Sequence, residues 1–166
     1  MIELLEDKAA LAHLAPGDIA RLTDAATAAT FYGAPLSDEQ MAANKRIVTI
    51  STASCEAAAA NAHQAFIAAF DGERCAGYVI STRHAENDHE LDWLMVHPDF
   101  HGTPVSRLLM QRGIDWLGAD QSIWLNVIAF NQRAIRFYEK FGFAIDADAR
   151  THHLVPHVIM RRAAIA

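Results

Sequence analysis

The sequence predicts a single domain of the mixed α/β class, in which an antiparallel meander of strands is followed by a helix–strand–helix–strand unit. Strand-like segments separated by short polar connections cover residues 64–70, 75–82 and 90–96. Apolar residues then recur at helical spacing over residues 105–117, and a strand-like alternation follows at 123–129. A second helical pattern begins after Asn131. A meander followed by such a unit predicts a mixed sheet with helices on both faces.

Length and composition fit one folded domain that spans residues 1–166. Hydrophobic residues make up 52% of the chain and charged residues 20%, which provides enough apolar material for a substantial core. The net charge is -6 and the sequence pI is about 5.8. An acidic chain without a dense stripe of Lys and Arg argues against a nucleic-acid partner.

The cysteines and the N-terminus bear on the location of the protein. Cys55 and Cys75 form neither a disulfide framework nor a zinc-binding spacing, and we expect them to be small core residues. The first residues are charged and lack the apolar segment of a signal peptide. No apolar run approaches the roughly 20 residues that a membrane-spanning helix needs. We therefore expect a cytoplasmic protein that does not associate with membranes.

The N-terminal segment is expected to form a short edge strand and a helix. Residues 9–14 are assigned to the strand, and the Pro-Gly-Asp sequence at 16–18 is assigned to a turn. Asp18 is the expected N-cap of the helix, because a carboxylate at that position can accept a hydrogen bond from the first turn. Apolar residues at helical spacing extend this helix to about Thr30.

A second N-terminal helix follows a break at residues 33–35. Ser37 precedes Gln40 by three residues, which is the capping-box pattern of a helix start. The alanine-rich run at 57–60 is a good helix former, so we extend the helix into it.

The meander contains the first residues of chemical interest. Asp71 and Gly72 form a hairpin signal between its first two strands, and the polar residues 83–89 are expected to form the second connection. Strict alternation in the third strand places Glu90, Asp92, Leu94 and Val96 on one face and Leu91, Trp93 and Met95 on the other. Two carboxylates on one face raise each other's pKa, unless both lie on a solvated surface.

The second half of the chain has clear helix boundaries. A helix is expected to open near Pro104 and to end at Gly118, with Thr103 as a candidate N-cap. Asn131 is expected to cap the next helix, which closes at Gly142, and a last strand is assigned to residues 153–160.

Other polar and aromatic residues receive structural interpretations. His152, His153 and His157 resemble a loose metal cluster, but a strand would place His152 on the opposite face from the other two. We therefore expect no metal site. Core or sheet-packing positions are assigned to Trp93, Trp116 and Trp124.

Residues 131–143 read Asn-Gln-Arg-Ala-Ile-Arg-Phe-Tyr-Glu-Lys-Phe-Gly-Phe. This segment resembles a signature of the GNAT superfamily, in which an Asn and an Ala precede an aromatic-Tyr-Glu-Lys-x-Gly-Phe run. Val96-His97-Pro98 resembles the V-x-P strand end of the same family, and the clear resemblance covers residues 66–143. It implies the GNAT acyl-CoA N-acyltransferase fold. It also implies transfer of an acetyl group from acetyl-CoA, as cosubstrate, to a primary amine of a small molecule or peptide.

The resemblance implies a binding site for acetyl-CoA between two strands. In the family, the strand that ends in V-x-P separates from its neighbour, which is here the segment 123–129. Backbone groups of Leu94, Met95 and Val96 would then pair with the pantetheine arm and the thioester carbonyl. The residues implied in the pyrophosphate loop and the following turn are His101, Gly102, Thr103, Val105, Ser106 and Arg107. Asn131 is a further implied contact, although helix capping explains it equally well.

Pro104 departs from the family pattern, because it occupies the position of the first glycine of the pyrophosphate loop. Proline has no N–H and its φ is fixed, so at least one amide donor is missing there. Losing one hydrogen bond to a charged group costs roughly 1.5–3 kcal/mol, which is about tenfold to a hundredfold in affinity. The departure favours an alternative, in which the chain is a non-catalytic or regulatory CoA-binding module.

The resemblance also implies catalytic roles. Tyr138 matches the family tyrosine that protonates the departing thiolate, and its alternative role is that of a core aromatic residue. Glu90 matches a strand glutamate that serves as base in some members, and Asp92 on the same face is a second candidate. The acceptor stays open among a polyamine, an aminoglycoside, an amino acid and a protein N-terminus. Homodimerisation is common in the family and also stays open. A third interpretation, an interaction domain without a cofactor, requires the signature to be accidental.

Overall fold

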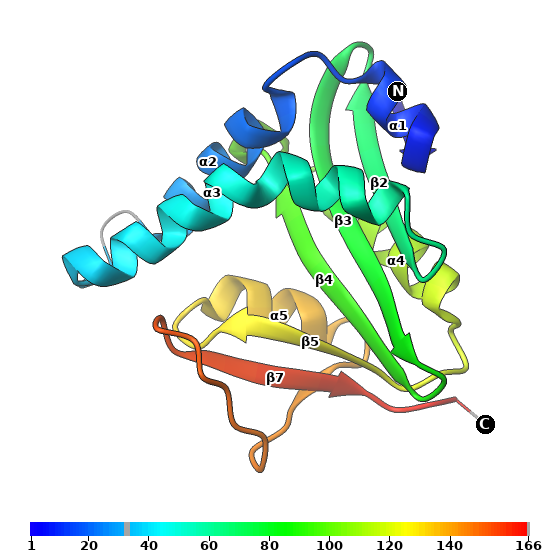
Figure 1. Ribbon diagram of the computed structural model, residues 1–166. Helices are drawn as coiled ribbons and strands as arrows, with labels where there is room; N and C mark the ends of the chain where they lie inside the picture. The colour runs from blue at the N-terminus through cyan, green and yellow to red at the C-terminus, as the bar shows by residue number, and fades with distance from the viewer. Residues whose placement is uncertain (32–33, 166) are drawn as a thin grey trace.

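The computed structural model describes residues 1–31 and 34–165. Within these ranges, seven strands form one mixed sheet in the order β1-β2-β3-β4-β5-β7-β6, with helices on both faces (Figure 1). The strands are β1 (Ile2–Glu6), β2 (Gln64–Asp71), β3 (Arg74–Ala85), β4 (Asp88–Val96), β5 (Ile123–Ile128), β6 (Ala144–Ile145) and β7 (His157–Arg162). The helices are α1 (Asp7–His13), α2 (Asp18–Phe31), α3 (Asp38–Ala59), the 3₁₀ turn η1 (Pro98–Phe100), α4 (Val105–Leu117) and α5 (Gln132–Glu139).

The pairing pattern confirms the predicted meander and the unit that follows it. Strands β1 to β4 pair antiparallel with their neighbours in sequence. Strand β5 pairs parallel with β4 after the crossover through α4, since parallel neighbours cannot be joined by a tight turn. Strand β7 then pairs antiparallel with both β5 and β6.

Two hydrophobic clusters lie on opposite faces of the sheet. One face packs against α4 and α5 through buried residues that include Val79, Leu91, Leu109, Leu125 and Ile135. The other face packs against α1, α2 and α3 through buried residues that include Ala10, Leu22, Cys55, Phe66 and Tyr78. The expectation of helices on both faces is therefore confirmed. No helix within the described ranges has both the length and the apolar character needed to cross a membrane.

The N-terminal prediction was partly wrong. Residues 9–14, expected to be a strand, fall mainly in helix α1, because alanine favours helix. The edge strand is instead β1, which pairs with β2. Asp18 is the first residue of α2 rather than its N-cap, and its carboxylate accepts a hydrogen bond from the Ala15 amide. The helix ends at Phe31, close to the predicted Thr30.

The capping box at the start of α3 is confirmed. The Ser37 hydroxyl accepts a hydrogen bond from the Gln40 amide at 3.1 Å, and the Gln40 side chain accepts one from the Ser37 amide at 2.9 Å. The helix ends at Ala59, within the predicted run. Of the break predicted at 33–35, residue 33 lies outside the described residues.

The β2–β3 hairpin turns at Gly72 with φ of 62°, as the Asp-Gly signal predicted. The second connection is shorter than expected, because β3 continues to Ala85 and β4 begins at Asp88. Residues 83–88, most of them polar, are exposed, whereas His89 is buried and pairs with Arg83 across the hairpin. Most of the predicted connection is therefore strand.

Strand β4 does not alternate throughout, which corrects the predicted faces. Ile80 pairs with Asp92 and Tyr78 with Met95, so two residues of β4 oppose Val79 alone, as in a β-bulge. Trp93 in this bulge has φ of 47°. From the bulge onward, each side chain lies on the face opposite to the one predicted. Leu94 and Val96 join the cluster of Leu91, whereas Trp93 and Met95 join the opposite cluster, on the face of Glu90 and Asp92.

The later boundaries are mostly as predicted. Gly118 ends α4 with φ of 102°, and Gly142 follows α5 with φ of 88°. Pro104 is the N-cap of α4, where Thr103 was a candidate. The last strand was placed too early, because β7 runs from His157 to Arg162 and pairs with the unpredicted β6.

Candidate active site at the β4–β5 fork

Strands β4 and β5 pair over a very short distance. Their ladder consists of His89 with Ile123 and Glu90 with Trp124. Beyond this point the two strands diverge (Figure 1), while β5 stays paired with β7 along its whole length. We call this point the fork. From residue 91 to 96, β4 has no ladder partner on the side of β5, so the backbone groups on that edge lack a strand partner, although the Val96 backbone is hydrogen-bonded to His101.

The bulge lies on the same stretch of β4. A positive φ at a non-glycine residue such as Trp93 costs about 1–3 kcal/mol and persists only where the surrounding structure enforces it. Bulges near active sites reorient the strand beside the site. Here the bulge lies immediately before Leu94, Met95 and Val96, the residues predicted to pair with pantetheine. It shifts the register of the strand, so their side chains lie on the faces opposite to those that regular alternation would give.

Two carboxylates lie next to the fork on the face of the sheet that α1, α2 and α3 cover. Glu90 is buried, with 7% of its surface exposed, so the alternative of a solvated face is wrong for this residue. Burial raises the pKa of Glu90, although His84 and Asn126 act to lower it. Burial and the neighbouring charge of Glu90 raise the pKa of Asp92 to about 7. The prediction that the two residues share a face and interact is confirmed.

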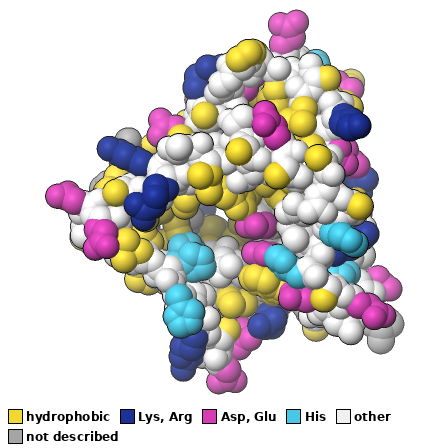
Figure 2. Space-filling model, viewed as in Figure 1, with side chains coloured by type: hydrophobic (Ala, Val, Ile, Leu, Met, Phe, Trp, Pro, Cys, Tyr) yellow, Lys and Arg dark blue, Asp and Glu magenta, His cyan; other side chains and the backbone are white. Residues whose placement is uncertain are grey.

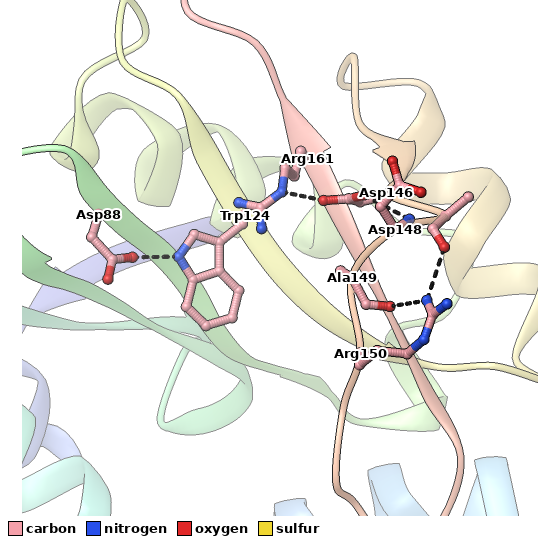
Figure 3. Close-up of polar contacts among 8 residues, drawn as sticks. Asp88, Trp124, Asp146, Asp148, Ala149, Arg150 and Arg161 are labelled. Carbon is pink, nitrogen blue, oxygen red and sulfur yellow. Dashed lines mark hydrogen bonds and ion pairs between the residues drawn. The ribbon is translucent and has the colours of Figure 1, made fainter.

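His84 and Trp124 complete the fork. His84 Nε2 lies 2.7 Å from Glu90 Oε2. The His84 ring stacks on the Trp124 indole, with 5.9 Å between centroids and 20° between planes. The indole Nε1–H donates a hydrogen bond of 2.6 Å to Asp88 (Figure 3). Trp124 therefore holds His84 and Asp88 in place at the fork, whereas it was predicted from the sequence to be only a packing residue.

Asn126 lies on the same face of β5 as Trp124, because Ile123, Leu125 and Val127 alternate with them and belong to the other core. Its side chain lowers the pKa of Glu90. Within the described residues, the buried Asn126 Oδ1 has no hydrogen-bond partner. A buried acceptor of this kind suits a ligand N–H or a water molecule.

The loop between η1 and α4 contains the residues predicted to bind pyrophosphate. Gly102 has φ of 78°, and no atom lies within 4 Å of where its Cβ would be, so a ligand can approach its backbone. The Thr103 hydroxyl donates a hydrogen bond to the Phe100 carbonyl and accepts one of 3.4 Å from the Val105 amide. Val105 is fully buried and its amide is already hydrogen-bonded to Thr103, so neither its side chain nor its N–H is open to a ligand here. Pro104 contributes no amide.

Basic side chains surround this loop. Arg133 Nη1 donates a hydrogen bond of 2.9 Å to His101 Nδ1, which joins the loop to the start of α5. Burial and the charge of Arg133 lower the pKa of His101. Ser106 is partly buried and Arg107 exposed, in the first turn of α4. A helix N-terminus with the Arg133 guanidinium nearby suits an anion.

Helix α5 carries the other two predicted residues. The Asn131 side chain accepts a hydrogen bond of 3.1 Å from the Ala134 amide, so its capping role is confirmed. Tyr138 packs on the core at the α4 face of the sheet, near Phe137 and Phe143. Burial raises the pKa of Tyr138 to about 12, so its phenol keeps its proton at neutral pH.

A hollow opens on the other face, between α3 and the strands β5 and β7, with acidic and histidine side chains around it (Figure 2). Near its lower edge, Asp88, Trp124 and Arg161 help to line a cavity of about 360 Å³. Arg161 Nε pairs with Asp146 at 2.6 Å and so holds the segment after β6 against β7 (Figure 3). The centroids of the His153 and His157 rings, in the segment before β7 and at its start, lie 4.0 Å apart.

Four residues of this site were not predicted from the sequence: His84, Trp124, Asn126 and Arg133. His84 lies in a segment that the sequence assigned to a connection. Its proximity to Glu90 follows from the β3–β4 hairpin, which becomes evident only when both strands are extended to its tip. Arg133 stands inside the signature segment but has no assigned role there.

Comparison with known proteins identifies the family. Residues 27–143 match the family model described as "Acetyltransferase (GNAT) family". Uncharacterized N-acetyltransferases of Mycobacterium tuberculosis and Mycobacterium bovis are 39% identical over 98 residues, which make up 57% of this chain. The matched region spans 61% of the length of those relatives.

Solved structures agree with the fold. The PaiA N-acetyltransferase of Thermoplasma acidophilum, in complex with coenzyme A, superposes with a TM-score of 0.75 at 18% identity, over 98% of this chain and 99% of that one. The ribosomal-protein-S18-alanine N-acetyltransferase of Escherichia coli gives a TM-score of 0.63 at 19% identity, over 100% and 96%. Since these identities are low, the likeness shows the fold alone. Together with the family match, the forked sheet and the α5 signature establish that the chain belongs to the GNAT family of acetyltransferases.

Proposed function

We propose that this protein is an N-acetyltransferase that transfers the acetyl group of acetyl-CoA to a primary amine at the fork. The observation that carries the proposal is the unpaired edge of β4 beside two carboxylates of raised pKa. The free backbone groups suit a thioester and its amide-bearing arm. The carboxylates suit the removal of a proton from an amine.

The acyl donor would lie along β4 and reach the start of α4. Backbone groups of Leu94, Met95 and Val96 would bind the pantetheine arm. The pyrophosphate would bind at the open backbone of Gly102, the first turn of α4 and the nearby Arg133. These groups fit an anionic ligand even though Pro104 provides no N–H.

The acceptor would enter from the hollow on the opposite face. Glu90, Asp92 and the Oδ1 atom of Asn126 are all hydrogen-bond acceptors near the fork, and an ammonium group is a donor of three hydrogen bonds. A base is most effective when its pKa lies near the working pH, and the pKa of Asp92 is about 7. This favours a primary amine over a hydroxyl acceptor.

The reaction is a direct transfer. One of the carboxylates takes a proton from the ammonium group, and the neutral amine attacks the thioester carbonyl. The new C–N bond forms and the C–S bond breaks. Tyr138, protonated at neutral pH, gives its proton to the departing thiolate, and the second proton that the attacking nitrogen loses as it becomes an amide restores the phenol.

Pro104 favours a second candidate, a GNAT-fold module that binds CoA without turnover. Release of free thiol separates the two. The test is an assay with acetyl-CoA and a panel of spermidine, kanamycin, L-lysine and an alanyl peptide. Thiol release with any of these amines supports the enzyme, whereas CoA binding without release across the panel supports the module.

Matched variants locate the chemistry at the fork. Glu90→Gln and Asp92→Asn should each reduce turnover, one of them by about 100-fold or more. Glu86→Gln, at the exposed tip of the same hairpin, is the control and should keep wild-type activity. If Glu90→Gln and Asp92→Asn both match the control, the base does not lie at the fork.

A further inference from the structure

The fork contains a side-chain pair to which the proposed reaction assigns no role. His84 Nε2 and Glu90 Oε2 are 2.7 Å apart. The side chain of Glu90 is 9% exposed, whereas that of His84 is 43% exposed. A proton that reaches Glu90 therefore has little direct contact with solvent, and His84 is the group that joins the buried carboxylate to the surface.

Both members of the pair are held by the same piece of structure. Glu90 is fixed by its ladder pairing with Trp124, the last pairing before the fork. His84 is fixed by stacking on the Trp124 indole, which Asp88 holds through its Nε1–H. One aromatic residue thus sets the positions of the carboxylate and of the imidazole. An exposed histidine without such support would sample many rotamers.

The surroundings of His84 favour proton transfer. His84 helps to line a cavity of about 610 Å³, which gives its ring access to water. The carboxylates of Asp88 and Asp92, both on β4, lie close to the pair, and the charged residues Arg83 and Glu86 line the same cavity as His84. From β5, the pair meets the uncharged side chains of Trp124 and Asn126.

On the basis of the function proposed above, we propose that His84 is a positioning residue that passes to solvent the proton which Glu90 takes from the acceptor amine. The ammonium N–H bond breaks and a Glu90 O–H bond forms. That proton moves to His84 Nε2, and the imidazolium releases a proton from Nδ1 to water. Glu90 is then an anion again and His84 is neutral with its proton on Nε2. Protonation of Nδ1 by water and loss of the Nε2 proton restore the Nδ1–H tautomer before the next acceptor.

Two substitutions separate relay from simple orientation. His84→Ala removes the ring. His84→Gln keeps an N–H that can hydrogen-bond to Glu90 but cannot carry a proton. We expect both variants to lose about tenfold or more in kcat at pH 7, with a smaller change in the KM of the acceptor. Imidazole added to the solution should restore His84→Ala, because the site opens to solvent, and should not restore His84→Gln.

The control is His63→Ala, an exposed histidine on the same side of the molecule that makes no contact with a carboxylate among the described residues. It should keep wild-type kcat and should not respond to imidazole. Thermal unfolding of each variant checks that the fold is retained. The assay uses acetyl-CoA with whichever amine of the panel gives the fastest thiol release.

Each outcome decides the matter. Rescue of His84→Ala alone supports the relay. Wild-type kcat in His84→Gln overturns the relay and leaves His84 an orienting role. Wild-type kcat in His84→Ala, or a slow variant that imidazole does not restore, also overturns it. A wild-type protein that releases no thiol with any amine overturns the proposed function itself, and the relay with it.

Discussion

Glu90 and Trp124 form the last pair of the β4–β5 ladder, and the backbones of the two strands part immediately beyond them. The same two residues contact His84, one through a 2.7 Å polar contact and the other through ring stacking. The point where the sheet opens is therefore also the point where ionisable groups gather. A ligand along the opened edge of β4 would meet these groups without any rearrangement of the strands.

Substitution of Tyr138 by Phe tests the proposed acid. We expect kcat to fall by about 100-fold while the affinity for acetyl-CoA changes little, because the hydroxyl acts on the departing sulfur. Steady-state kinetics and calorimetric CoA binding measure the two effects. The melting temperature should stay near that of wild type, since the ring packing is kept. An unchanged kcat would rule out Tyr138 as the acid.

Substitution of Pro104 by Ala tests the cost of the missing amide. Alanine restores an N–H at the start of α4, so the affinity for CoA should rise by about tenfold. The new N–H is expected to bind the pyrophosphate and not the 3′-phosphate. The gain in affinity should therefore persist with dephospho-CoA, which lacks the 3′-phosphate. Pro16→Ala, in the exposed turn before α2, is the control. Equal CoA affinities in wild type and Pro104→Ala would show that position 104 does not face the pyrophosphate.

Asp92 makes stability depend on pH. Burial raises the pKa of Asp92 to about 7 in the folded protein from its ordinary value of 3.8, so the folded state keeps a proton that the unfolded chain loses. Stability therefore falls as the pH rises from about 4 to about 7, and the loss is complete above that range.

Asp92→Asn removes this penalty, so the variant should be more stable than wild type by up to roughly 4 kcal/mol at pH 8 and similar to it at pH 4. Urea denaturation at the two pH values measures the difference. Asp24→Asn, on the exposed surface of α2, is the control and should show no such pH-dependent gain. A gain of the same size at both pH values would contradict the assigned protonation.

Gly77 allows β3 and β4 to approach next to the bulge. A Cβ at this position would lie 2.8 Å from the Met95 carbonyl oxygen and 3.0 Å from a methyl group of Leu109. Gly77→Ala should therefore displace the backbone of Met95, lower stability by about 1–3 kcal/mol and weaken CoA binding. Denaturation and calorimetry test both effects. Loss of stability with unchanged CoA affinity would show that the ligand does not use this part of β4.

The sequence predicted those parts of the fold that short-range interactions determine. The start of α3 follows from Ser37 and Gln40, which interact within one helical turn. The end of α4 follows from Gly118, which takes a positive φ that other residues avoid. The bulge at Trp93 could not be predicted in this way. The residues on both sides continue an alternating pattern, and the shift is imposed by pairing with β3.

Candidate site residues could be predicted where a sequence pattern identifies them. They could not be predicted where their contacts form only in the tertiary fold. Glu90 and Asp92 were found because two carboxylates stand two positions apart on one strand. His84 was overlooked because a polar, exposed hairpin has the composition of a loop. Trp124 was assigned to packing because the hydrogen bond to Asp88 and the stacking on His84 arise only when β5 lies beside β4.

Thermal unfolding with and without millimolar CoA or acetyl-CoA tests the central claim most directly, because it asks whether the opened edge of β4 and the Pro104 loop hold the donor. A ligand at 100 times its Kd stabilises the folded state by about 2.7 kcal/mol, which shifts Tm by a few degrees in a domain of this size. We expect such a shift with both ligands. No shift with either would contradict donor binding at the fork.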